Sequence, residues 1–184
     1  MTRRVVARVV AAQAGLVVGL AACVVVHPSY VLGRDEGGVS NYGVHPLTGV
    51  IYTLAFALDA GLLTLAARAT PRTHRAVRTV LGVDAALVVA TLASTYPYQH
   101  GEPWHDLHVV VGAALLCFQL AASLWLVRGI GATTRGAVVA QAIGVALGAL
   151  AIAGVARTLF VGQAVATVAF AGVLVAGVRS RLAR

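Results

Sequence analysis

The sequence predicts an all-α membrane protein, a bundle of six transmembrane helices with both termini in the cytoplasm. Hydrophobic residues make up 59% of the 184-residue chain and charged residues 11%, with a mean hydropathy of +0.88. An ordinary water-soluble domain is about half apolar and about a quarter charged. Long apolar runs also alternate with short groups of arginines. We therefore interpret residues 1–184 as a single transmembrane domain.

The apolar runs are each about twenty residues long, which is enough to cross a hydrocarbon core of about 30 Å. Pro46 opens the second run. Residues 136–178 contain one charge, Arg157, and at about 1.5 Å per residue this stretch is too long for one span, so it predicts a hairpin of two. The predicted spans are 5–26, 46–67, 76–94, 104–127, 136–155 and 158–178.

The arginines predict the orientation of the bundle. In this layout Arg34 and Arg157 lie on one side of the membrane, and the other twelve lie on the opposite side, at positions 3, 4, 8, 68, 72, 75, 78, 128, 135, 179, 181 and 184. Cytoplasmic loops carry an excess of positive charge. The formal charge of +8 therefore indicates topology and no nucleic-acid partner.

The two cysteines lie inside apolar runs. Cys23 and Cys117 are expected to behave as small hydrophobic residues, without a disulfide between them. Residues 20–23, LAAC, also resemble a lipoprotein lipobox, in which Cys23 would be lipidated. Three valines follow where a lipoprotein usually becomes polar, so we interpret the segment as the first span.

Residues 95–108, TYPYQHGEPWHDLH, are the strongest candidate for a functional site. His105 and His108 are three residues apart at the start of a helix, so they share one face and can bind one divalent metal such as zinc. Glu102 and Asp106 can act as further ligands, as partners of the imidazoles, or as general acid and base. Helix capping and hydrogen bonding near the headgroups is the alternative role of the histidines.

A second polar loop, residues 27–45, lies on the same predicted outer side. We expect it to form the other wall of an outward-facing pocket with the 95–108 segment. The predicted ligand-binding residues of this pocket are His105, His108, Glu102, Asp106, His100, Ser40, Asn41, Tyr42 and His45. The prolines beside His27 and His45 also favour a role in anchoring the loop.

Five polar residues are predicted inside the membrane, about 8 to 14 Å from the cytoplasmic boundary by helix rise. They form an intramembrane polar layer of Asp59, Asp84, Gln13, Gln119 and Gln141. Acids at this depth are costly unless they pair or face the bundle interior. The layer either sets the helix register or carries protons or cations.

The layout resembles a bacterial membrane family known as domain of unknown function 998, and is similar, more loosely, to the Frag, DRAM and Sfk group. Ser40-Asn41-Tyr42-Gly43 and Pro46 match the family's first motif, and Tyr96-Pro97 followed by His105 or His108 matches its second. Tyr96 replaces the commoner phenylalanine. The resemblance implies six helices in a bacterial plasma membrane and membrane lipids as partners, and it implies no reaction.

We expect an integral membrane protein whose outward His/acid pocket binds or processes lipid headgroups or a small polar ligand. One alternative is a proton- or cation-coupled transporter that uses Asp59 and Asp84. Another is a non-enzymatic accessory subunit of a larger membrane complex, or a homo-oligomer, that packs through Gly15-x-x-x-Gly19 or Gly144-x-x-x-Gly148. The sequence leaves open whether the protein is an enzyme.

Overall fold

The protein is an all-helical bundle in the computed structural model, which describes residues 2–31, 37–128 and 130–183. Within these residues six helices are long and apolar enough to cross a membrane, and no strand is present. The predicted fold class is therefore confirmed. The six are α1 (Thr2–Val26), α3 (Gly49–Ala69), α4 (Arg75–Thr95), α5 (Glu102–Leu126), α6 (Ala132–Ile152) and α7 (Leu159–Leu182).

The helix bounds differ from the predicted spans by up to four residues at an end. The second long helix starts at Gly49, because residues 45–48 form a turn in which the His45 carbonyl accepts from the N–H groups of Thr48 and Gly49, at 3.2 and 2.9 Å. This turn follows the short helix α2 (Asn41–Val44). At the other end of the chain α7 continues to Leu182, because a helix that leaves the apolar layer can carry Arg179 and Arg181 in its last turn.

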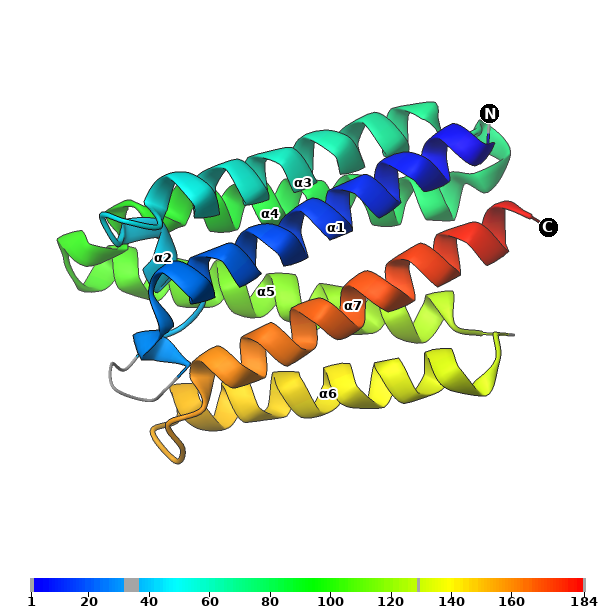
Figure 1. Ribbon diagram of the computed structural model, residues 1–184. Helices are drawn as coiled ribbons and strands as arrows, with labels where there is room; N and C mark the ends of the chain where they lie inside the picture. The colour runs from blue at the N-terminus through cyan, green and yellow to red at the C-terminus, as the bar shows by residue number, and fades with distance from the viewer. Residues whose placement is uncertain (1, 32–36, 129, 184) are drawn as a thin grey trace.

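Successive long helices run antiparallel, and both termini lie at one end of the bundle (Figure 1). The most extensive contacts join α6 to α7 and α1 to α3, followed by α3 to α4. α5 packs mainly against α4 and touches α6 much less. The α6–α7 hairpin is therefore joined to the other four long helices mainly through α7, which contacts both α1 and α5.

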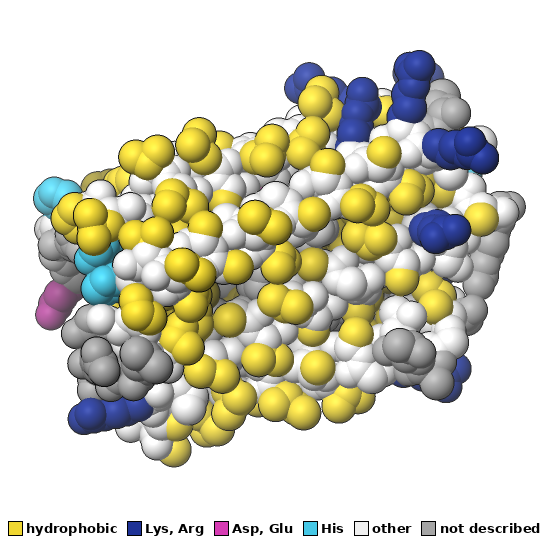
Figure 2. Space-filling view, in the orientation of Figure 1, with side chains coloured by type: hydrophobic (Ala, Val, Ile, Leu, Met, Phe, Trp, Pro, Cys, Tyr) yellow, Lys and Arg dark blue, Asp and Glu magenta, His cyan; other side chains and the backbone are white. Residues whose placement is uncertain are grey.

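Most described arginines lie at the end of the bundle that carries the termini, which we call the arginine-rich end (Figure 2). Arg181 fastens α7 to α5 there, because its guanidinium lies 4.5 Å from the Trp125 ring centroid and donates to the Trp125 carbonyl at 2.6 Å. Arg157 lies between α6 and α7, at the opposite end. That opposite end, the histidine-rich end, carries His27, His45, His100, His105 and His108.

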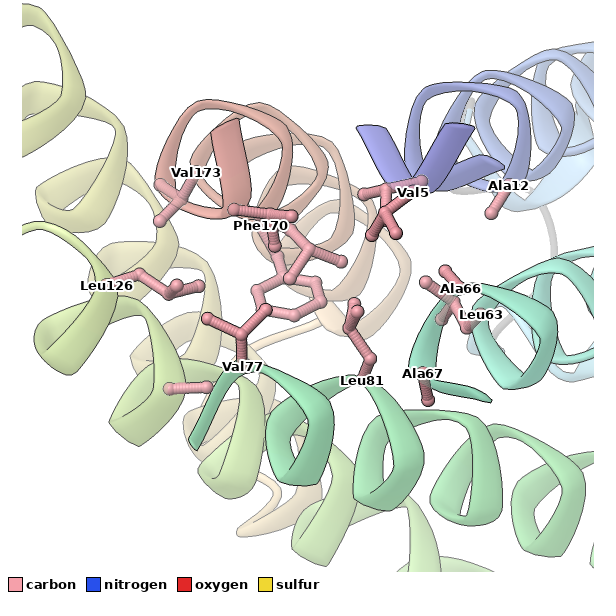
Figure 3. Close-up of a cluster of buried hydrophobic side chains, with 14 of the residues drawn as sticks. Val5, Ala12, Leu63, Ala66, Ala67, Val77, Leu81, Leu126, Phe170 and Val173 are labelled. Atoms are coloured by element: carbon pink, nitrogen blue, oxygen red, sulfur yellow. The ribbon is translucent and has the colours of Figure 1, made fainter. Parts of the chain in front are cut away.

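A cluster of buried side chains fills the arginine-rich half of the bundle (Figure 3). Phe170 of α7 is 1% exposed and lies among side chains from α1, α4 and α5, with Leu81 and Leu126 beside it (Figure 3). Lipid tails are as apolar as these residues, so close packing and dispersion, and not removal from water, hold them together. This packing holds together the helices that continue into the histidine-rich half.

Glycines allow the closest helix contacts. A methyl group added at Gly144 of α6 would lie 2.6 Å from the Ala166 nitrogen of α7, and one added at Gly162 of α7 would lie 2.6 Å from the Gly148 nitrogen. One added at Gly19 of α1 would lie 2.4 Å from Ala55 Cβ of α3. Both glycine patterns noted in the sequence therefore lie at close helix contacts, within this one chain.

Candidate functional site

A cavity of about 240 Å³ is lined mainly by α5 and the α6–α7 hairpin, with further lining residues from α1, α3 and α4, and it reaches the histidine-rich end. We call it the His108 cavity. Its outer end is polar and is lined by Ser40, Asn41, His105, His108 and Gln163. Its walls are apolar and include Leu116, Val145, Ile152 and Leu159. At its inner end it reaches Gln119, so the cavity is polar at the mouth, apolar along its length and polar again at its floor.

His108 lies between two serines at the mouth of this cavity. Its Nε2 is 2.8 Å from Ser40 Oγ, and its Nδ1 is 2.9 Å from Ser94 Oγ. Ser40 belongs to the outer segment before α2, Ser94 to the last turn of α4 and His108 to the second turn of α5. One imidazole thus joins three elements that are far apart in the sequence.

The hydrogen bonds of Ser94 favour one tautomer of His108. The Ser94 hydroxyl donates to the Thr91 carbonyl at 3.0 Å, in the back-bonding that serine commonly makes within a helix. Its single proton is then used, so Ser94 Oγ accepts from His108 Nδ1–H. In this tautomer Nε2 of the neutral imidazole carries the lone pair and faces the Ser40 hydroxyl, which also forms a hydrogen bond with Tyr52.

The segment that carries Ser40 is held in place from both sides. The Val39 N–H donates to Gln163 Oε1 of α7 at 2.7 Å, and the Gly38 N–H donates to Asn41 Oδ1 at 3.3 Å. A methyl group added at Gly38 would lie 2.6 Å from Gln163 Oε1, so a larger residue here would have to displace the Gln163 side chain. Ser40 therefore has a defined position although it lies outside the long helices.

The buried side chain of Tyr42 also holds this segment in place. Its ring is fully buried against Phe160 and Tyr30, at centroid distances of 5.7 and 5.1 Å, and its hydroxyl donates to the His27 carbonyl at 3.0 Å. Burial raises the pKa of Tyr42 to about 12, with smaller contributions from the neighbouring Cys23 and Tyr30. The buried ring thus favours the protonated hydroxyl.

Tyr42 is expected to make the fold sensitive to alkaline pH. Because its pKa is higher in the folded than in the unfolded chain, its contribution to stability is complete below about pH 10 and is lost as the pH rises to about 12. The thermal midpoint in detergent should fall over this range, and the fall should be smaller in Tyr42→Phe. An equal fall in both proteins would contradict this role.

The other predicted pocket residues are placed differently. His45 stacks on His27 with a centroid distance of 4.0 Å, and His100 is exposed with Nδ1 3.3 Å from the Pro97 carbonyl. Glu102 and Asp106 are exposed on the first turns of α5 and do not line the cavity. The cavity thus brings together Ser40, Asn41, His105 and His108, while the Tyr42 side chain lies behind its wall.

The predicted metal site has no third ligand in the part of the chain that the structure describes. No group of three or more His, Cys, Asp or Glu residues that could hold a metal ion occurs within residues 2–31, 37–128 and 130–183. His105 and His108 both line the cavity, but each ring nitrogen of His108 already faces a serine hydroxyl. A metal would have to displace one of these serines.

Two residues that contact the mouth segment or His108 were not predicted from the sequence. Ser94 is 5% exposed and Gln163 is half-buried on the last helix. A serine near a helix end and a glutamine in an apolar span have no pattern that links them to His108. Only their packing against α5 and the Ser40 segment assigns them to this site.

The predicted polar layer consists of separate pairs. Gln13 of α1 donates to Asp59 Oδ1 of α3 at 2.8 Å, and Gln119 of α5 donates to Asp84 Oδ1 of α4 at 3.0 Å. Gln141 of α6 is fully buried, and among the described residues neither atom of its amide group has a hydrogen-bond partner. Each acid therefore accepts a hydrogen bond from a glutamine of a neighbouring helix.

Both cysteines are free. Cys23 is buried near the Thr48 carbonyl, with its sulfur 3.9 Å from the oxygen, whereas Cys117 is exposed and lines the His108 cavity.

Comparison with known proteins gives no match to a family model, to a curated protein or to a solved structure.

Proposed function

We propose that this integral membrane protein binds one amphiphilic molecule in the His108 cavity. The polar group of the ligand lies at Ser40 and His108, and its apolar chain lies between α5 and the α6–α7 hairpin. The observation that carries the proposal is a hydrogen-bonded imidazole at the polar mouth of a mostly apolar cavity. Ligand sites commonly combine apolar walls with a few placed polar groups.

The sides of the cavity support entry from the lipid. Ala113 and Cys117 of α5 and Ala149 and Ile152 of α6 all line it, and all four are exposed on membrane-spanning helices. These residues form the two edges of a lateral opening where α5 and α6 make few contacts. A molecule dissolved in the membrane can therefore enter sideways with its apolar part first.

The volume limits what fits. Sites that enclose drug-sized ligands measure about 300 to 1,000 Å³. The His108 cavity, at about 240 Å³, holds part of an amphiphile, and the rest of its chain remains in the lipid.

We place the histidine-rich end outside a bacterial plasma membrane, since most arginines lie at the other end. The ligand would then come from the outer leaflet.

Filling the cavity is expected to abolish binding. Gly148 is buried and lines the cavity, and a methyl group added there meets no atom within 4 Å. Gly148→Leu should therefore occupy the space without displacing the backbone, and co-purified lipid should be lost in native mass spectrometry. In the unaltered protein an added amphiphile should protect Cys117 from a lipid-soluble maleimide, and this protection should also be lost in Gly148→Leu.

The matched control is Gly61→Leu. Gly61 is an exposed glycine in the middle of α3, an added methyl group there also meets nothing within 4 Å, and it does not line the cavity. This variant should bind like the unaltered protein. If Gly148→Leu also retains lipid and protects Cys117 normally, the cavity is not the binding site.

A proton- or cation-coupled transporter is the second candidate. It is favoured by one contact, since Gln119 lines the cavity and also donates to Asp84. A pH-dependent flux in vesicles that is lost in Asp59→Asn would support it. Membership of the family named above, a homo-oligomer and a role as accessory subunit stay predictions.

A further inference from the structure

Ser40, His108 and Ser94 have the arrangement of a nucleophile, a base and a group that orients the base. Ser40 Oγ is 2.8 Å from His108 Nε2, and His108 Nδ1 is 2.9 Å from Ser94 Oγ. Both distances lie within the 2.6–3.2 Å range typical of such sets. Ser40 and His108 line the cavity, where a substrate can reach them, whereas Ser94 is buried behind them.

The direction of the hydrogen bonds matches this order of roles. Ser94 is bonded to the Thr91 carbonyl, so it holds the proton of His108 on Nδ1. The Nε2 lone pair then faces the Ser40 hydroxyl, which is the tautomer that a general base for Ser40 requires. The opposite tautomer would direct a proton at Ser40 and could not activate it.

We infer that the protein is an acyl-transfer enzyme, with Ser40 as nucleophile and His108 as its general base. This inference rests on the proposed binding function and names the substrate class: an amphiphile with a carboxylic ester between its polar head and its acyl chain. Ser40 and His108 lie where the polar mouth meets the apolar walls. An amphiphile bound with its chain in the cavity has its ester at this junction.

The reaction balances with water as the second substrate. Ser40 Oγ bonds to the ester carbonyl carbon while its proton passes to His108 Nε2. The tetrahedral intermediate then breaks its bond to the alcohol, which leaves with the proton from Nε2, and the acyl group stays on Ser40. Water, deprotonated by Nε2, attacks this acyl-serine, and the products are a free carboxylic acid and the original Ser40 hydroxyl.

Gln163 is placed to stabilise the oxyanion of the tetrahedral intermediate. Its Oε1 accepts from the Val39 N–H, so its NH₂ group is the end of the amide that can donate to a ligand. The side chain lines the same polar mouth as Ser40. An amide donor aimed at a developing oxyanion is a common source of rate enhancement.

An alkyl fluorophosphonate tests the inference directly, since it forms a stable ester with an activated serine and releases fluoride. The purified full chain in mild detergent should be labelled at Ser40, as located by peptide mass spectrometry. Labelling should be absent in Ser40→Ala. It should be at least about 100-fold slower in His108→Ala, as expected for loss of a general base, and added imidazole should restore part of it.

Additional variants separate catalysis from structure. His108→Gln can keep a hydrogen bond to Ser40 at the position of Nε2 but cannot take up a proton, so it should remain unlabelled. Ser94→Ala should lower kcat for a para-nitrophenyl ester with little change in KM, because it removes the group that orients the base. Ser123→Ala is the matched control on α5, because Ser123 does not line the cavity, and it should react like the unaltered protein.

The outcomes distinguish this inference from the binding function. An unlabelled Ser40 in a protein that still binds amphiphile through the cavity would overturn the catalytic inference and leave the binding function standing. Labelling of His108→Gln at the rate of the unaltered protein would overturn the role of the base. If Gly148→Leu loses both amphiphile binding and Ser40 labelling, the result supports the binding function and the catalytic inference. If the unaltered protein neither binds amphiphile nor reacts with the fluorophosphonate, both are overturned.

Discussion

Gln119→Leu is expected to lower the free energy of unfolding by about 1–3 kcal/mol, and by more where the carboxyl of Asp84 is ionised. The Gln119 amide donates to Asp84 Oδ1 at 3.0 Å, and among the described residues Asp84 Oδ2 has no hydrogen-bond partner. Asp84 is fully buried, so leucine would leave a carboxyl group without any donor in the bundle interior. The thermal midpoint in detergent, followed by circular dichroism, should fall by several degrees.

The same substitution at Gln141 is the matched control. Gln141 is also fully buried in a long helix, but among the described residues its amide nitrogen and oxygen both lack a partner. Gln141→Leu should therefore leave the midpoint unchanged or raise it, since it removes two unsatisfied groups. The double variant Asp84→Leu/Gln119→Leu should recover most of the loss, and a loss that is simply additive would show that the pair does not interact.

Gly144→Ala is expected to destabilise the α6–α7 hairpin by about 1–3 kcal/mol, the usual cost of overpacking. The new methyl group would lie 2.6 Å from the Ala166 nitrogen and 2.7 Å from the Gly162 carbonyl oxygen. Both are backbone atoms of α7, so no side chain can rotate away and the helices must separate. The thermal midpoint should fall, and proteolysis between α6 and α7 should become faster.

Gly148→Ala is the control one turn further along the same helix. A methyl group there meets nothing within 4 Å, so the substitution removes a flexible glycine from a helix without a steric cost. It should be neutral or stabilising by up to about 1 kcal/mol. If both variants lose the same stability, the close approach at Gly144 is not what holds α6 to α7.

The fold was largely predictable because a membrane imposes its own length on apolar segments. Every backbone group in the hydrocarbon must bond internally, so a run of about twenty apolar residues has few alternatives to a helix. The errors are at the ends of helices, where hydrophobicity carries little information. Pro46 marks the turn before α3 and not its first residue, and Arg179 and Arg181 continue α7 beyond the predicted boundary.

The candidate site was predictable only where its residues are close in sequence. His105 and His108 are one helical turn apart, so their shared face followed from the helix period. Glu102 and Asp106 are as close in sequence, yet they remain exposed away from the cavity, because the packing of α5 decides which of its faces is covered. The contribution of Ser94 and Gln163 required the neighbours of α5 to be known.

The amino-acid sequence alone determined the class of protein, the number of membrane-spanning helices and the separation of arginines from most histidines. These properties depend on transfer of single segments into lipid, which is additive along the chain. The tertiary structure decided that Ser40 meets Nε2 of His108, that Ser94 meets Nδ1, and that an apolar cavity opens beside them. Those contacts join residues up to 68 positions apart, and their geometry depends on helix packing that no local pattern specifies.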